Sequence, residues 1–323
     1  EVFFFDEVVP NPTIEGVEKG VAIALKNKVD FVLGVGGGSV LDTAKLIAFL
    51  HNSTAKIDWN KAMSDYDNPF SMTPSPKESL PFIAVSTTSG TGSQCTQAAV
   101  VSDTKSKNKV TLFHAGLFPV IAIVDPELMC SVPNKVTAAT GFDAFTHAFE
   151  SFLGGRTSPM TEQMSLQAIQ LVLDNLPKAI ADPKNIEVRS NLAWADTLAG
   201  MCLANGGADL PHPLGEIIGG ICPRVAHGDT LAMVYPAFLN YKAVEAPEKF
   251  ILVANHLNLK PDPAALIEAI LNLFQLTGLS TALEKANLTQ QEIESIMGHP
   301  LLSQLQPENS DRIHQMMDES LNK

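Results

Sequence analysis

Basic residues, cysteines and long apolar runs are all scarce in this sequence. Its 323 residues contain 22 Lys and Arg against 35 Asp and Glu, which gives a formal net charge of −13. An excess of negative charge repels nucleic-acid phosphates and anionic lipid headgroups, and this argues against both as the main partner. No apolar run reaches the roughly 18–20 residues that a membrane-spanning helix needs. We therefore expect neither nucleic acid nor a membrane as a partner.

The cysteines are few and far apart, and no two of them form a CxxC pair: Cys95, Cys130, Cys202 and Cys222. This usage favours buried thiols in a reducing compartment over a disulfide framework. The chain begins at Glu1 with neither Met nor a signal peptide. We expect a cytoplasmic protein whose natural N-terminus lies further upstream. With 45% hydrophobic and 18% charged residues, the composition is that of an ordinary globular enzyme, large enough for two domains.

Apolar strands and amphipathic helices alternate over the first 125 residues. Thr13 is placed to cap a helix through about Lys26, and a second helix extends to about Leu50. Residues 51–80 are polar and rich in proline, and they predict a long surface connection. The apolar runs predict strands at 1–5, 30–35, 81–86 and 119–124, with 30–35 and 81–86 buried, and a hairpin at 98–102 and 109–113. This order predicts right-handed crossovers and a mainly parallel, Rossmann-like sheet.

The pattern changes after Pro126, where apolar residues recur at every third and fourth position without β-branched runs. This periodicity predicts helices, most clearly at 160–180, 189–203, 264–274 and 290–297. The sequence thus predicts an α/β domain over residues 1–131 and an all-α domain over residues 132–323.

A glycine-rich turn joins a predicted strand to a predicted helix in the segment GVGGGSVLDTAK at 34–45. Its three consecutive glycines let the backbone approach a ligand, and the helix that follows directs free N–H groups and its positive dipole end at the same place. This geometry suits a pyrophosphate, although Ser39 breaks the usual GxGxxG fingerprint. A capping box formed by Ser39 and Asp42 would explain the same residues without a ligand.

A second polar loop, STTSGTGSQ at 86–94, directly follows the predicted strand at 81–86. Small hydroxylated residues offer hydrogen bonds and close backbone approach, and open α/β sheets bind ligands at the carboxyl ends of their strands. This second loop alone is compatible with a flexible surface turn. Two such loops at one edge of a sheet favour a ligand site.

Four side chains of metal-ligand type occur in the predicted helical domain. Asp143 and His147 stand at i and i+4 in GFDAFTHAFE, so both face one side of a helix. Burial of this pair among apolar neighbours is costly without a partner. His212 and His227 follow at long spacing. One carboxylate and three imidazoles suit Fe(II) or Zn(II), whereas each histidine taken alone is more often structural.

Several long segments occur in a characteristic order: GGGSVLDTAK, TTSGTGSQ, DPELMCSVPNKVTAATGFDAFTHAFES, LPHPLGEIIGGI and AHGD. Together they resemble the iron-containing, or group III, alcohol dehydrogenases, and the resemblance extends over essentially the whole chain. It implies a dinucleotide-binding domain, a helical domain and an active site between them. It places Asp143, His147, His212 and His227 on the metal-ligand positions. The residues that match positions near the cofactor are Asn11, Gly36, Gly37, Gly38, Ser39, Asp42, Thr87, Thr88, Thr91, Val100 and Lys109.

The resemblance implies hydride transfer between NAD or NADP and a small primary alcohol or aldehyde, with a metal as Lewis acid on the substrate oxygen. It also implies self-association, which we expect to give a homodimer. The chain departs from the family pattern in three ways. The family's first strand–helix unit, which selects NAD or NADP, is absent; Gln94 replaces the usual Glu; and Glu216 replaces a common second His near the nicotinamide. Glu216, for the alcohol proton, and His227 are therefore the catalytic candidates.

Two alternatives remain open from the sequence. The same architecture resembles glycerol dehydrogenases and dehydroquinate-synthase-type enzymes. A synthase of that type needs a dense basic cluster, and the helical domain offers Arg156, Arg189 and Arg224 without one. The other alternative is a nucleotide- or metal-binding member that has lost catalysis, because Glu216 replaces a common His.

Overall fold

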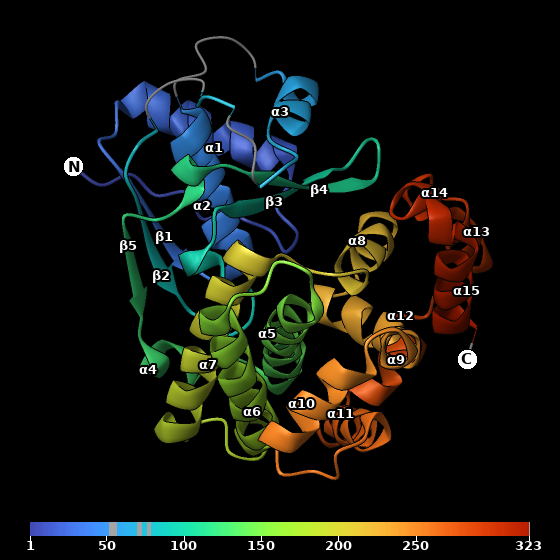
Figure 1. Ribbon diagram of the computed structural model, residues 1–323. Helices are drawn as coiled ribbons and strands as arrows, with labels where there is room; N and C mark the ends of the chain where they lie inside the picture. Colours follow the sequence, from blue (N-terminus) through green and yellow to red (C-terminus); the bar gives the residue numbers. More distant parts are fainter. Residues whose placement is uncertain (52–56, 70–72, 76–78, 323) are drawn as a thin grey trace.

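Strands and helices alternate in the first part of the chain, and helices alone make up the rest (Figure 1). The computed structural model describes residues 1–51, 57–69, 73–75 and 79–322. This arrangement confirms the predicted fold class, a parallel α/β region followed by an all-helical region.

Three strands form a parallel sheet in the order β1-β2-β5. They are β1 (Val32–Gly36), β2 (Phe82–Ser86) and β5 (Ile121–Val124). Gly36 pairs with Ser86, and Ser86 pairs with Val124, so the three strands end at one edge of the sheet. The glycine turn and the second polar loop both leave from this edge. The predicted hairpin is also confirmed, with β3 (Ala98–Asp103) antiparallel to β4 (Asn108–Phe113).

Helix α2 (Gly38–Leu50) covers one face of the parallel sheet. Its apolar side packs against Phe82 and Ala84 of β2. Helix α1 (Ile14–Asn27) packs beside α2 and begins, as predicted, at Thr13, whose side chain accepts a hydrogen bond from the helix backbone. A single helix layer therefore fixes where the sheet edge and its loops lie.

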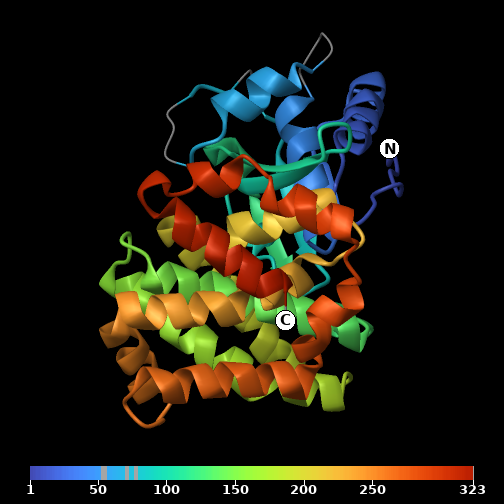
Figure 2. The ribbon, with the colours of Figure 1, turned by 90° about the vertical axis from the view of Figure 1, so that its right-hand side faces the viewer.

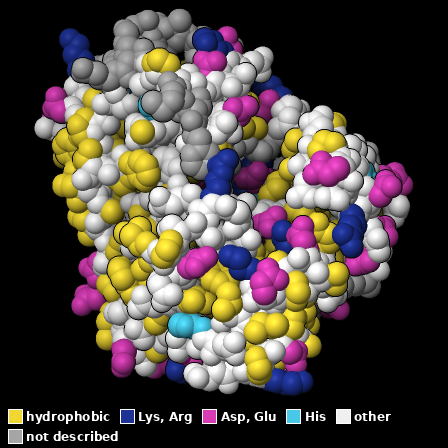
Figure 3. Space-filling view, in the orientation of Figure 1, with side chains coloured by type: hydrophobic (Ala, Val, Ile, Leu, Met, Phe, Trp, Pro, Cys, Tyr) yellow, Lys and Arg dark blue, Asp and Glu magenta, His cyan; other side chains and the backbone are white. Residues whose placement is uncertain are grey.

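The opposite face of the sheet is open to solvent. Leu33 and Val35 of β1 are 53% and 54% exposed, and Ile121 and Ile123 of β5 are 52% and 46% exposed. Figure 3 shows hydrophobic side chains gathered along the flank where β1 and β5 lie in Figure 1. The prediction of a buried strand at 30–35 is therefore wrong for this face, because side chains alternate along a strand and only every second one meets α2.

Two other predictions for this region are wrong. Residues 1–5 form no strand: Val2 and Phe4 are 74% and 85% exposed, and the parallel sheet consists of β1, β2 and β5. An apolar run becomes a strand only where another strand's edge and a packing surface meet it. The connection at 51–80 lies partly outside the described residues, and it contains α3 (Trp59–Asp65), where the buried Trp59 anchors the chain to the core.

Helix α5 (Asn134–Leu153) lies at the centre of the helical region. Helices α6, α7 and α9 pack around it, and its Phe142, Phe145 and Phe149 are fully buried. The other helices of the region are α4 (Pro126–Met129), α6 (Pro159–Ala181), α7 (Ile186–Gly206), α8 (Pro211–Ile221), α9 (His227–Glu245), α10 (Pro247–His256), α11 (Pro263–Thr277), α12 (Ala282–Ala286), α13 (Gln290–Met297), α14 (Leu301–Gln304) and α15 (Ser310–Leu321). The four helices predicted from periodicity are confirmed as α6, α7, α11 and α13.

The last helices close one side of the molecule. Helix α13 packs against α8, and α15 packs against α9 (Figure 2).

All four cysteines are free thiols, and Cys202 and Cys222 are buried. In the described part of the chain no single helix is long and apolar enough to cross a membrane. Helix α11 and residues 279–286 together have the necessary length and apolar composition, but the two segments meet at an angle of 86°.

Candidate metal and nucleotide site

Asp143 and His147 lie one turn apart in the middle of α5 and face the same way. They are only 3% and 4% exposed, because the helix is surrounded by other helices along most of its length. The Oδ1 atom of Asp143 lies 3.5 Å from His147 Nε2. The i, i+4 spacing read from the sequence therefore produces the predicted pair.

The starts of two further helices bring His212 and His227 to the same carboxylate oxygen. His212 lies in the first turn of α8, and His227 is the first residue of α9. Their Nε2 atoms lie 3.7 Å and 3.8 Å from Asp143 Oδ1. Ligand atoms of Asp143, His212 and His227 all lie within 4.8 Å of one another. Three helices thus converge on one point.

The distances within this cluster fit a shared metal ion better than hydrogen bonds. Separations of 3.5–3.8 Å are too long for N–H···O bonds. Ligands held at about 2.1 Å around a tetrahedral ion lie about 3.4 Å apart. Within the described residues, the buried Asp143 Oδ1 and His212 Nε2 have no hydrogen-bond partner. Buried polar atoms without partners are costly, and a divalent metal would satisfy both.

Burial and neighbouring charges shift the pKa values of this cluster. Burial alone would raise the pKa of Asp143, but the imidazoles around it, His147 above all, outweigh burial and hold this pKa well below 3.8. Burial lowers the pKa of His147 to about 4, and burial together with the positive charge of Lys109 lowers that of His227 well below its usual range. Burial opposes a charged His212, but the carboxylates beside it raise its pKa to about 10. An ionised Asp143 and neutral His147 and His227 are the forms that bind metals.

The glycine turn leaves the first N–H groups of α2 without a side-chain cap. Gly37 is the N-cap residue, and among the described residues the first turn has neither a side-chain cap bond nor an acidic residue. The alternative of a capping box is therefore wrong, and Ser39 Oγ instead accepts a hydrogen bond from Asn11 N at 3.3 Å. Asn11 also donates through Nδ2 to Pro223 O at 3.1 Å, which ties the turn to the helical region. Uncapped N–H groups at a helix start suit a phosphate.

Gly36 and Asp42 fix the neighbouring segments around this turn. Thr87 N donates to Gly36 O at 3.0 Å. The carboxylate of Asp42 accepts from Ser93 Oγ at 2.6 Å and from Val100 N at 3.0 Å. Asp42 and Val100, both predicted to lie near a cofactor, therefore join α2 to the hairpin. A direct contact of either residue with a cofactor stays a prediction.

The second polar loop packs directly on the glycine turn. A Cβ atom added to Gly37 would lie 3.0 Å from Thr88 Oγ1, and one added to Gly38 would lie 2.4 Å from Thr91 Cγ2. A distance of 2.4 Å is far below van der Waals contact, so a side chain at Gly38 would push the two loops apart. The glycines thus allow both loops to form one surface at the sheet edge.

The same loop also contacts the helical region. A Cβ atom on Gly90 would lie 2.5 Å from Thr140 of α5, three residues before Asp143. Asp196 of α7 accepts hydrogen bonds from Gly92 N and from Gln94 Nε2, each at 2.8 Å. We call Asp143, His147, His212 and His227 the metal-type cluster. The second polar loop therefore touches the glycine turn on one side and α5, which carries Asp143 and His147, on the other.

Sequence reasoning did not identify Asp196, and the only signal for it is a lone acid in the apolar segment NLAWADTLAG. Burial raises the pKa of Asp196 to about 7. The contact with Gln94 gives a physical reason for the departure from Glu at that position, since an amide N–H can donate a hydrogen bond to a buried carboxylate. A second carboxylate there would have to be protonated to do the same.

Lys109 and Glu216 lie where β4 meets α8. Thr111 Oγ1 donates to Glu216 Oε1 at 3.0 Å. Burial lowers the pKa of Lys109, and the negative charges of Glu216, Asp143 and Asp42 act against this shift. Lys109 is thus within electrostatic range of both the metal-type cluster and the helix that follows the glycine turn.

Comparison with known proteins agrees with this geometry. The family described as "Fe-containing alcohol dehydrogenase family, C-terminal" matches residues 137–320, and "Iron-containing alcohol dehydrogenase" matches residues 1–126. This chain belongs to the iron-containing alcohol dehydrogenase family.

Relatives in this family carry several different names. The chain is 40% identical over 240 residues to "Long-chain-alcohol dehydrogenase 1" of Geobacillus thermodenitrificans, covering 74% of this chain and 58% of that protein. It is 32% identical over 254 residues to "NAD-dependent methanol dehydrogenase" of Bacillus methanolicus, covering 79% of this chain and 64% of that protein. The chain therefore spans less than two thirds of the length of these two relatives.

Solved structures in this family share the fold over nearly the whole chain. A 1,3-propanediol oxidoreductase is 30% identical, with a TM-score of 0.87 over 99% of this chain and 84% of that one. A sulfoacetaldehyde reductase from Bifidobacterium kashiwanohense, solved in complex with NAD+, is 29% identical, with a TM-score of 0.83 over 99% of this chain and 83% of that one.

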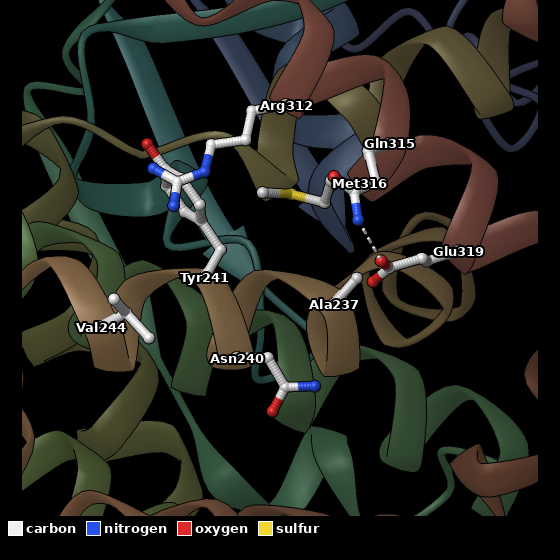
Figure 4. Close-up of a pocket in the computed structure, with 8 residues that line it drawn as sticks. All are labelled: Ala237, Asn240, Tyr241, Val244, Arg312, Gln315, Met316 and Glu319. Carbon is white, nitrogen blue, oxygen red and sulfur yellow. Dashed lines mark hydrogen bonds between the residues drawn. The ribbon is translucent and has the colours of Figure 1, made fainter.

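A surface pocket of about 250 Å³ lies between α9 and α15 (Figure 4). The guanidinium of Arg312 lies over the ring of Tyr241, 5.0 Å from its centroid, and Gln315 Nε2 donates to Glu319 Oε1 at 2.9 Å. None of the predicted site residues lines this pocket. It is therefore separate from the metal-type cluster and the glycine turn.

Proposed function

We propose that this chain acts as a metal-dependent, NAD-linked alcohol dehydrogenase that interconverts a small primary alcohol and its aldehyde. The observation that carries the proposal is the convergence of Asp143, His212 and His227 on one point, next to a loop that packs on the glycine turn. The relative named as an NAD-dependent methanol dehydrogenase and the reductase solved with NAD+ support NAD as the cofactor.

In this proposal Asp143, His147, His212 and His227 hold the metal. A divalent ion bound by this set, with Fe(II) and Zn(II) both suitable, supplies a Lewis acid for the oxygen of an alcohol or aldehyde. The near-complete burial of Asp143 and His147 keeps water away from these ligands and strengthens electrostatic effects around them.

Other residues of the chain bind the cofactor and accept or return the proton of the alcohol. The uncapped N–H groups of α2 bind the pyrophosphate of NAD, and Lys109 adds a positive charge close by. Alcohol oxidation transfers a hydride to the nicotinamide and releases one proton. Glu216, held by Thr111 and near Lys109, accepts this proton in the forward direction and returns it during aldehyde reduction.

The decisive test is the replacement Asp143→Ala. We expect loss of bound metal and a fall in kcat/KM of about 10³-fold, equal to roughly 4 kcal/mol, because the Lewis acid is lost. Bound metal is measured by mass spectrometry, and turnover is followed by NADH oxidation with a panel of aldehydes. Asp174→Ala, at an exposed position of α6, serves as the control. Full metal content and turnover in Asp143→Ala would refute the proposal.

One alternative and two further expectations have their own tests. NADH binding by the unmodified chain without turnover of any aldehyde would favour a member that has lost catalysis. The homodimer and the cytoplasmic location stay predictions, which light scattering after size-exclusion chromatography and cell fractionation can check.

A further inference from the structure

A buried glutamate lies directly behind one of the four metal-type side chains. Glu150 of α5 is fully buried, and its Oε2 atom accepts a hydrogen bond from His212 Nδ1 at 2.8 Å. The same oxygen accepts a second bond from Asp209 N, also at 2.8 Å. Because a carboxylate oxygen can only accept, this contact requires the proton of the imidazole to be on Nδ1.

The contact with Glu150 determines which nitrogen of His212 faces the cluster. When His212 binds a metal as the neutral ring, its remaining proton stays on Nδ1 and its lone pair is on Nε2, which lies 3.7 Å from Asp143 Oδ1 and has no hydrogen-bond partner among the described residues. A ligating imidazole needs this arrangement, with the outer N–H held by an acceptor.

His147 and His227 lack such a partner. Their Nδ1 atoms are buried and, within the part of the chain that the structure describes, are not bonded to a carboxylate. A contact of His147 with the backbone of Gly90 acts to raise its pKa. Their Nε2 atoms face Asp143 Oδ1 at 3.5 Å and 3.8 Å. Of the three imidazoles, His212 is therefore the one whose tautomer and ring orientation are set by a carboxylate in the described structure.

The geometry points to Glu150 as a positioning residue for the metal site, an inference that rests on the proposed function. Glu150 holds His212 in the ligating tautomer, restricts the ring's rotation and places negative charge behind it. Each of these effects favours metal binding, and outer carboxylates of this kind typically change metal affinity by about 10–100-fold.

A merely structural role for Glu150 can be separated from this one. Its bond to Asp209 N connects α5 to the loop before α8, and the next residue makes a similar connection, since Ser151 Oγ donates to Gly207 O at 2.7 Å. Ser151 is also buried. The replacement Ser151→Ala therefore removes a buried α5-to-loop bond without touching His212, which makes it a matched control.

The experiment compares the wild type with Glu150→Gln, Glu150→Ala and Ser151→Ala. Each full-length chain is stripped of metal and titrated with Zn(II) against a competing chelator, and the absorption spectrum with Co(II) reports ligand geometry. Glu150→Ala should bind Zn(II) about 10–100-fold more weakly and change the Co(II) spectrum. Glu150→Gln keeps one acceptor oxygen for both bonds but loses the charge, so a measurable weakening of up to about tenfold is expected. Ser151→Ala should bind as the wild type does.

Several outcomes would overturn the inference. Wild-type affinity and an unchanged Co(II) spectrum in both Glu150 variants would do so, as would an equal loss in Ser151→Ala, which would indicate bracing of the loop. If Glu150→Ala does not fold, the nearly isosteric Glu150→Gln decides the question. Metal binding by the wild type that is insensitive to Glu150 removes this inference alone. If the wild type binds Zn(II) no more tightly than Asp143→Ala does, the proposed metal site is refuted, and this inference is refuted with it.

Discussion

The two regions of this molecule enclose their apolar residues in different ways. Helices surround α5 in the helical region, so that Phe142, Phe145 and Phe149 have no exposed surface. The parallel sheet is covered by α2 on one face, whereas Leu33 and Ile121 on the other face are more than half exposed.

This difference decides how each part of the site is built. The metal-type cluster lies on closely packed helices, and packing together with the bond from His212 to Glu150 holds Asp143 and its three imidazoles in place. The loops at the sheet edge have no such enclosure. They depend on contacts between glycines and threonines, and on hydrogen bonds to Asp42 and Asp196. Truncations of core side chains should therefore damage the helical region most, and changes to single contacts should damage the loops most.

The largest difference is expected between truncations in the two regions. Phe250→Ala removes a fully buried ring that packs against Phe149, and it should lower the free energy of unfolding by about 3–5 kcal/mol. Leu33→Ala, on the open sheet face, should change it by about 0.5 kcal/mol or less. Urea denaturation of both variants measures the contrast. A similar loss for both would show that something covers the open face in solution.

The second effect concerns the buried carboxylate that joins α7 to the second polar loop. Burial raises the pKa of Asp196 from 3.8 to about 7, so the folded chain retains a proton that the unfolded chain releases. Stability of the wild type should therefore fall as pH rises from about 4 to about 7, by up to about 4 kcal/mol relative to Asp196→Asn, and then stay level.

Urea titrations of the wild type and Asp196→Asn across this pH range test the effect at equal metal loading. The amide introduced by this replacement can keep the contacts of the carboxylate, because the Gln94 amide can turn and present Oε1, which has no hydrogen-bond partner in the described residues. Parallel stability curves for the two proteins would contradict the raised pKa.

A smaller effect is expected for the glycine turn. In Gly38→Ala the new Cβ would lie 2.4 Å from Thr91, and relief of this overlap costs about 1–3 kcal/mol. NAD should bind about tenfold more weakly, while bound metal stays unchanged. In Gly155→Ala the added Cβ meets no described atom within 4 Å, and this variant should bind NAD normally. Calorimetric titration with NAD measures both variants, and equal affinities would show that the turn does not hold the cofactor.

The smallest effect is expected where β4 meets α8. The hydrogen bond from Thr111 to Glu216 is partly buried and should contribute about 1 kcal/mol. A double-mutant cycle with Thr111→Val and Glu216→Ala should give a coupling free energy of about this size in urea denaturation. Additive effects of the two replacements would mean that this bond does not connect the two regions.

Features that depend on nearby residues were predictable. The cap at Thr13, the helices at 160–180 and 290–297 and the pairing of Asp143 with His147 all follow from spacing within a few turns. His212 and His227 were candidates from residue type alone, and the resemblance to a family supported them, because spacing in the chain carries no information about where two distant helix starts meet.

Other features were mispredicted or missed because their partners are remote in the sequence. The apolar run at 1–5 reads as a strand, but the sheet is completed by other segments. Ser39 and Asp42 read as a capping box, but Asn11, Ser93 and Val100 take their hydrogen bonds instead. In each case a tertiary contact outweighed the local structural preference of the segment.

The sequence by itself determined where most helices and strands occur, which face of α5 carries polar groups, and that glycines occupy the turn before α2. These properties depend on interactions within one or two turns of chain. Only the tertiary structure decided that one oxygen of Asp143 faces three imidazoles, that Glu150 holds His212 across 62 positions of sequence, and that Asp196 holds the second polar loop. Such contacts arise when packing brings distant helices together, and hydrophobic burial, which drives that packing, does not specify polar partners in advance.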